Sequence, residues 1–150
     1  MLMTPSTALP DPYYQAEFYA DVPVKRLFAW IIDMVMIVLL CAIILPFTAF
    51  TALFFFPFFL LVVGFAYRVL TLWGRSATWG MRLMAIEART HRGERLGFAM
   101  AFAHTLGYSV SIALVMPQIL SIILMLTSGR AQGLTDLLLG TVLINRPARN

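Results

Sequence analysis

The chain has 150 residues, of which 61% are hydrophobic and only 12% are charged, and its net charge at pH 7 is +4. Soluble domains usually carry about 25% charged residues, so this composition is typical of a protein embedded in a lipid bilayer. Arginines beside the apolar segments account for the positive charge, and no nucleic-acid partner is expected, since none of the basic regions forms a soluble face with stacking aromatics. The single cysteine, Cys41, excludes a disulfide framework and a cysteine-based metal site.

Residues 1–20 are expected to form a flexible or interfacial N-terminal tail. They are rich in proline and hold several aromatic side chains suited to the headgroup level of a membrane. This start has no basic region followed by an apolar core, as a secretory signal would have. The first apolar segment is therefore expected to stay in the protein as a true span.

The first span is predicted over residues 23–45, between a proline suited to the first helical turn and Pro46, which ends or kinks the helix. Asp33 lies inside it, where a carboxylate costs roughly 2.5–3.5 kcal/mol on insertion scales. Arg26 precedes Asp33 by almost two helical turns, so both side chains share one face, about 10.5 Å apart along the axis. A chain keeps such a carboxylate when it pairs with another group or moves one, which makes Asp33 the first candidate functional residue.

Two further apolar segments follow and differ in kind. The second is predicted over residues 48–72, with Arg68 in its last turns. The third covers residues 96–127, carries no charge at neutral pH and contains His104. Because a span needs only about 20 residues, this segment is either one tilted, kinked helix or two short helices that meet near residues 111–117.

The loop over residues 73–103 has an unusual charge pattern. It carries five arginines against two glutamates, whereas the link near residues 46–51 carries no charge. The positive-inside rule therefore places this loop and the N-terminus in the cytoplasm. Residues 82–88 alternate partly and a turn follows them, so a short β-hairpin on the membrane surface is predicted.

The tail after residue 127 is also basic and also prefers the cytoplasm. Three clean spans would place it on the other side, whereas a re-entrant or paired third segment removes the conflict. The predicted fold is thus an all-α integral membrane protein with three hydrophobic segments, a cytoplasmic hairpin-like loop and a short C-terminal tail over residues 147–150. No Walker loop, HExxH or GxSxG motif is present, so neither an enzyme nor a cofactor is expected.

Depth brings three polar residues to one predicted layer. Asp33 and His104 each lie about 10 Å below the cytoplasmic ends of their helices, and Arg68 lies about 6–9 Å deep. An Asp33–Arg68 ion pair would gain on the order of 4 kcal/mol at an effective dielectric near 20, which offsets the burial of the carboxylate. Three interpretations stay open: a structural clamp, a relay in which His104 exchanges protons with Asp33, or groups that do not meet.

In these residues and their spacing, the chain resembles the RDD family of small, mostly bacterial membrane proteins, named for one Arg and two Asp residues. Arg26 and Asp33 in KRLFAWIID match the first Arg and first Asp, and Asp136 in GLTDLLLGTVLI matches the second Asp. The stretch from GRSATWGMRLM onward is similar to the family's middle block, and the resemblance covers residues 20–146, with residues 21–146 as its domain. Met81 stands where the family usually has Lys, and His104 where it often has a second Arg.

The resemblance implies a membrane protein for which a transport role, including cation/proton exchange, has been suggested. Its candidate pathway residues here are Arg26, Asp33, Arg68, His104 and Asp136. For Asp136 two roles stay open: it caps a short helix, or it folds back to pair with Arg26. The alternative to an antiporter is a non-transporting scaffold or accessory subunit whose charges lock the bundle.

The expected surroundings are the lipid bilayer of a bacterial cytoplasmic (inner) membrane. The basic loop over residues 73–103 is expected to contact anionic lipid. Small residues within the spans favour close helix contact and hence a homo-oligomer. These residues are Ala29, Ala42, Gly64, Gly107 and Ser111.

Overall fold

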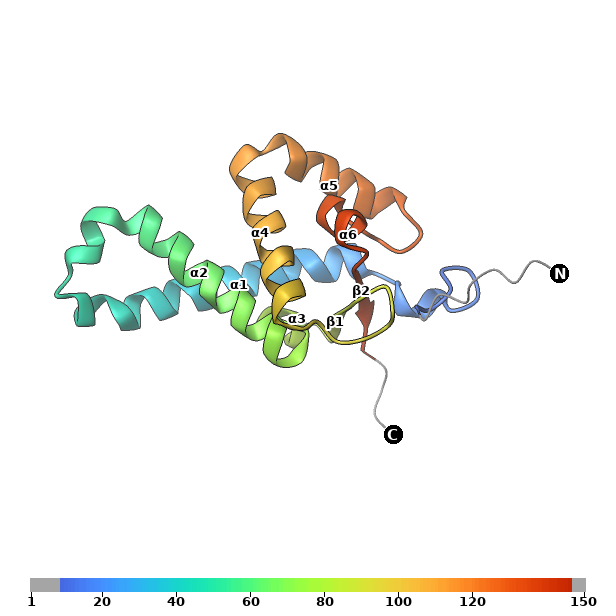
Figure 1. Ribbon diagram of the computed structural model, residues 1–150, viewed down its shortest axis with the longest axis horizontal. Coiled ribbons are helices and arrows are strands. Elements are labelled where there is room, and N and C mark those ends of the chain that lie inside the picture. Colours follow the sequence, from blue (N-terminus) through green and yellow to red (C-terminus); the bar gives the residue numbers. More distant parts are fainter. Residues whose placement is uncertain (1–8, 147–150) are drawn as a thin grey trace.

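The computed structural model describes residues 9–146, and the tail predicted over residues 147–150 lies outside the described residues. Within the described part, a long helical hairpin extends from one end, and shorter helices gather around a two-stranded sheet at the other (Figure 1). The polar groups of interest lie where the hairpin meets these shorter helices.

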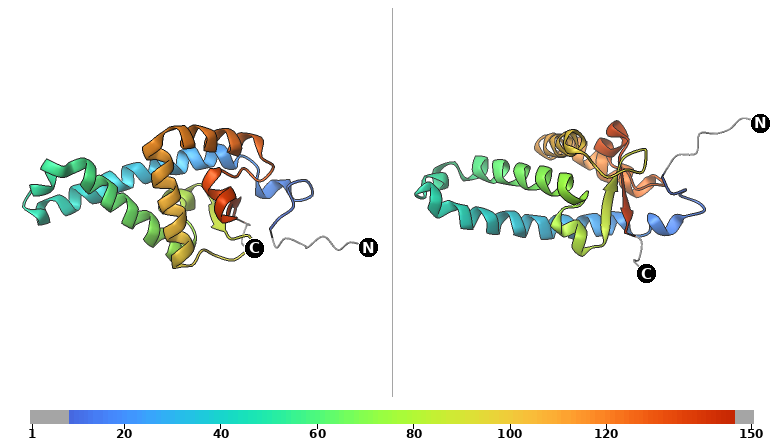
Figure 2. Two further views of the ribbon diagram at one scale, coloured as in Figure 1. Left: turned by 45° about the horizontal axis from the view of Figure 1, so that its top comes forward. Right: turned by 60° about the horizontal axis from the view of Figure 1, so that its bottom comes forward.

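The hairpin consists of α1 (Val22–Ile44) and α2 (Phe56–Arg75), joined by the 3₁₀ turns η2 (Leu45–Thr48) and η3 (Thr51–Phe55). A proline opens each helix and also η2, as expected where an N–H has no helical acceptor. Two consecutive left-handed residues between the turns reverse the chain. The two helices are in contact and run side by side in the right view of Figure 2.

Two helical segments are long and apolar enough to cross a membrane, Ala16–Thr48 and Thr51–Arg75, and the bent pair described next gives a third if it counts as one span. Their outer faces expose large apolar side chains, among them Phe47 at 86% and Phe54 at 84% exposure. Such a surface suits lipid rather than water.

The third apolar segment is two helices, α4 (Phe98–Leu114) and α5 (Met116–Thr127), bent by 115° at their junction. Val115 forms the break with φ 61°, a backbone conformation that is strained for a β-branched residue. The paired-helix alternative is therefore the correct one. The bend turns the chain back toward the sheet.

The predicted hairpin within residues 73–103 is wrong. Its first half contains the short helix α3 (Trp79–Leu83) and strand β1 (Ile86–Arg89), but β1 pairs antiparallel with β2 (Val142–Asn145) from the end of the chain. The segment after the turn is not free to pair, because the Leu96 N–H donates to Ser76 Oγ at 2.8 Å. The sheet therefore joins the middle of the chain to its C-terminal part.

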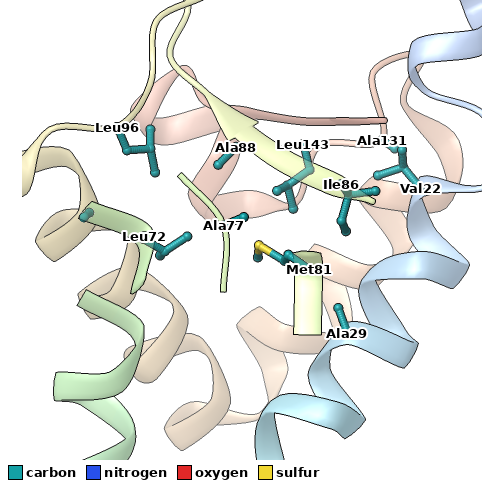
Figure 3. Packing of buried hydrophobic residues seen from close by; sticks show 11 residues of the cluster. Val22, Ala29, Leu72, Ala77, Met81, Ile86, Ala88, Leu96, Ala131 and Leu143 are labelled. Atoms are coloured by element: carbon teal, nitrogen blue, oxygen red, sulfur yellow. The ribbon is translucent and has the colours of Figure 1, made fainter. Parts of the chain in front are cut away.

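The main apolar core lies between the sheet and the ends of α1, α2 and α4. Figure 3 shows its side chains converging, with Ala77 and Met81 between Leu72 on one side and Ile86 on the other. This core holds α3 against α1, because Met81 of α3 and Ala29 of α1 both belong to it. The buried members are Val22, Ala29, Leu72, Ala77, Met81, Ile86, Ala88, Leu96, Ala101, Ala131 and Leu143.

The described part of the expected N-terminal tail also contacts the sheet. It forms the 3₁₀ turn η1 (Ala16–Phe18), and buried Tyr19 packs with Val142 and Ile144 of β2. The Tyr19 hydroxyl donates to the Pro10 carbonyl at 2.8 Å. The structured region thus begins before residue 21.

Candidate functional site

Asp33 lies within α1, is 1% exposed, and accepts hydrogen bonds from two other helical elements. The Tyr67 hydroxyl of α2 donates to Oδ1 at 2.6 Å, and the Gly80 N–H of α3 donates to the same oxygen at 2.9 Å. The Thr78 hydroxyl, at the N-cap of α3, donates to Oδ2 at 2.7 Å. One carboxylate therefore connects α1, α2 and α3.

The sequence of α3 explains this contact. Thr78 accepts the Met81 N–H at 3.2 Å and so starts the helix, while its hydroxyl hydrogen remains free for Asp33. Gly80 allows the close approach: a Cβ there would lie 2.1 Å from the Ala29 carbonyl oxygen of α1. The absence of a side chain brings the backbone of α3 onto the carboxylate.

The interpretation in which the three polar residues do not pair fits the structure. Among residues 9–146, Asp33 forms no ion pair with Arg68 or His104. The expected Asp33–Arg68 clamp and Asp33–His104 relay contact are absent there because α3 occupies the carboxylate. His104 lies 2.9 Å from Asp136, and the guanidinium of Arg68 lies 3.8 Å from the ring centre of Tyr108.

Asp136 is the second buried carboxylate, at 1% exposure. Oδ2 accepts Arg26 Nη1 from α1 at 2.6 Å and the Gly133 N–H at 3.1 Å. Oδ1 lies 2.9 Å from His104 Nε2 of α4 and accepts the Thr141 hydroxyl at 2.8 Å. Asp136 thus ties α1 and α4 to the end of the chain.

The two roles left open for Asp136 are both present. Asp136 is the third residue of α6 (Leu134–Leu139), and its contact with the Gly133 N–H caps that helix. The same carboxylate pairs with Arg26, which lies 110 positions away in the sequence. A helix cap and a long-range ion pair therefore share one side chain.

Burial alone would raise the pKa of Asp136, but the Arg26 charge and the hydrogen bond from His104 hold it well below its usual range. A lowered pKa in the folded state means that this carboxylate contributes stability above its ordinary pKa of 3.8. The contribution is lost as the pH falls from there toward the folded-state pKa. The Asp136 cluster is thus built for the ionised carboxylate.

A cavity of about 660 Å³ lies beside both carboxylates, between α1, α4, α5 and α6. Arg26, Asp33, Arg68, His104 and Asp136 all contribute to its wall. The five residues singled out from the sequence therefore surround one space, although they form two separate clusters. The rest of the lining is mainly apolar.

Sequence reasoning missed the donors that satisfy the carboxylates: Tyr67, Thr78, Gly80 and Thr141. The first three surround Asp33 and the last contacts Asp136. Thr78 is a residue type that commonly caps helices, which was the available signal for α3. Within residues 9–146 no group of three or more His, Cys, Asp or Glu residues is arranged to hold a metal ion.

Apolar helices of spanning length, a bent apolar helix pair and buried charges at their junction are typical of helical membrane proteins. The RDD family model matches residues 21–140, and the chain belongs to this family. The match contains Arg26, Asp33 and Asp136. No curated protein and no solved structure matches the chain.

Proposed function

We propose that this protein is a membrane scaffold or accessory subunit whose buried charges lock the helix bundle. The observation that carries the proposal is that protein donors occupy all but one of the acceptor sites on its two buried carboxylates. A carboxylate has about four acceptor sites. Asp136 contacts four groups and Asp33 accepts three hydrogen bonds.

The occupied acceptor sites of the two carboxylates favour a structural role on energetic grounds. A cation or proton can use a carboxylate oxygen only when a lone pair is free or an existing donor leaves. Each buried donor that loses its acceptor costs about 1–3 kcal/mol. Asp136 would have to release one of its four partners. Release of Arg26 or His104 would separate α1 or α4 from α6.

A second candidate is a transporter that exchanges cations or protons, with Asp33 on its path. Two features favour it: the cavity lined by both carboxylates, and the one acceptor site that remains on Asp33 Oδ2. Ionisable groups inside membrane segments often belong to such paths. Because Asp33 forms part of the cavity wall, a solute inside the cavity could reach its carboxylate.

The substitution Asp33→Asn separates the two candidates. In the scaffold it lowers stability by about 1–3 kcal/mol, because an amide NH₂ must face one of three donors that now lacks an acceptor. Melting of the purified protein in detergent measures this loss, with the exposed Asp21→Asn as the matched control. The proposal fails if Asp33→Asn melts like Asp21→Asn and abolishes a cation-driven proton flux that the wild type sustains in proteoliposomes.

We further propose that the protein lies in a bacterial cytoplasmic membrane with its N-terminus and the loop over residues 73–103 inside. Because β2 pairs with β1, residues 142–145 lie on the same side as this loop. The re-entrant α4–α5 pair supports that arrangement.

Cysteine labelling tests the orientation. In a Cys41→Ser background, Arg92→Cys in the exposed turn should react with an impermeant maleimide only after the cells are opened. Phe47→Cys in η2, at the far end of the hairpin, should react from outside. The reverse labelling pattern would refute the assigned orientation.

Contact with anionic lipid is the partner interaction that we propose for the sheet end. Burial lowers the pKa of Arg82, and the nearby charges of Arg75 and Arg146 lower it further, so three arginines gather there. Phosphate headgroups relieve such repulsion.

Homo-oligomer formation stays a prediction. Three of the small residues expected to mediate it contact other parts of the same chain: Ala29, Gly64 and Gly107.

A further inference from the structure

The cavity contains a cation that the protein itself leaves unpaired. Arg68 is 6% exposed and lines the cavity, and within residues 9–146 its side chain forms no ion pair or hydrogen bond. Its Nε is buried without a partner, and its main contact is the ring of Tyr108. A buried guanidinium with five N–H donors and no acceptor is costly unless a ligand supplies one.

The other charges around the cavity leave this cation available. Arg26 is neutralised by Asp136, which also engages His104. Asp33 is the other carboxylate on the wall, but it accepts hydrogen bonds from Tyr67, Thr78 and Gly80. It does not come within ion-pair distance of Arg68. The guanidinium of Arg68 is therefore the charged group on the wall that has donors without acceptors, and such donors select an acceptor-rich anionic group.

The remainder of the wall selects an apolar body. Side chains of α1, α4 and α5 line it, including Leu27, Ile112, Ile119 and Leu126. Leu27 and Leu126 are also 57% and 68% exposed, so the cavity opens to the apolar outer surface of the molecule. In a membrane this opening would face acyl chains, which supplies an entry route.

We propose that the cavity binds a single-chain anionic amphiphile of the fatty-acid class, with its carboxylate on Arg68 and its chain between α1 and α5. A volume of about 660 Å³ lies within the usual range for small-molecule sites, about 300–1,000 Å³. A bidentate guanidinium–carboxylate contact would satisfy the free donors. This site is independent of the scaffold role, since the carboxylates keep their partners when it is filled.

Native mass spectrometry of the delipidated full chain in a neutral detergent tests the proposal, with palmitate, hexadecanol and inorganic phosphate as probes. Palmitate should bind at least tenfold more tightly than hexadecanol, and phosphate alone should not bind. Arg68→Gln should remove the preference for palmitate, whereas Arg92→Gln, at an exposed arginine, should keep it.

Ile119→Trp, which fills the apolar wall, should weaken the binding of both chains. Equal binding of palmitate and hexadecanol by the wild type would overturn the proposal, as would phosphate binding without a chain. If Arg68→Gln does not fold, the comparison of probes on the wild type and on Ile119→Trp still decides. Asp33→Asn tests the scaffold role separately, since it leaves Arg68 unchanged.

Discussion

Asp136→Asn is expected to destabilise the protein by about 3–5 kcal/mol, the usual cost of removing one partner from a buried ion pair. The Arg26 guanidinium, whose side chain is only 15% exposed, loses its counter-charge, and the four contacts of the carboxylate cannot all be kept by an amide. For a chain of this size the apparent melting temperature should fall by roughly 6–20 °C. Thermal unfolding in detergent measures the change.

The pH dependence of this difference provides an internal check. Because the folded-state pKa of Asp136 is lowered, the gap in stability between wild type and Asp136→Asn should be complete at pH 5 and shrink as the pH falls below 3.8 toward 3. Exposed Asp21→Asn should show no such gap. A gap that grows as the pH falls below 3.8 would contradict the role given to the Arg26–Asp136 pair.

Gly80→Ala is expected to lower the stability of the protein strongly, because it adds a methyl group where α3 contacts α1 and Asp33. The new Cβ would lie 2.1 Å from the Ala29 carbonyl oxygen and 2.8 Å from Asp33 Oδ1. The first of these is a backbone atom that no rotamer change can move, so α3 must leave α1 and the Gly80 N–H must leave Asp33. Overpacking commonly costs about 1–3 kcal/mol, and the broken hydrogen bond adds to it.

Gly74→Ala is the matched control, since a Cβ at Gly74 of α2 meets nothing within 4 Å. It should be neutral or stabilise the helix by up to about 1 kcal/mol. Melting curves of the two variants in one detergent give the comparison. If Gly80→Ala melts at or above the temperature of Gly74→Ala, then α3 does not pack on Asp33 as described.

The spans could be predicted because they depend on local composition. The predicted first span over residues 23–45 and observed α1 (Val22–Ile44) differ by one residue at each end. The excess length of the third segment predicted either one kinked helix or two helices that meet near residues 111–117, and the structure has the second. Apolar length and proline position are local signals that can be recognised without knowledge of tertiary contacts.

The partners of the buried carboxylates could not be predicted in this way. Helical depth alone placed Asp33, Arg68 and His104 in one layer, but depth says nothing about rotation around each helix axis. The short helix α3 decided the outcome, and five residues are too few to give a periodic pattern. The partner strand of β1 lies more than fifty residues later, beyond any hairpin signal.

The two carboxylates share α1 as a common support. Asp33 holds α2 and α3 against it, and Asp136 holds α4, α6 and the segment before β2 against its start through Arg26. This division explains why the charges lie at the junction rather than along the exposed hairpin. The scaffold role therefore depends on direct coupling between Arg26 and Asp136.

A double-mutant cycle measures that coupling most directly. Arg26→Gln, Asp136→Asn and the double variant would each be unfolded in mixed micelles and compared with the wild type. We expect the double variant to lose less unfolding free energy than the two single variants lose together, by about 1–3 kcal/mol. Additive losses would mean that the pair does not hold α1 to the end of the chain, and would contradict the scaffold role.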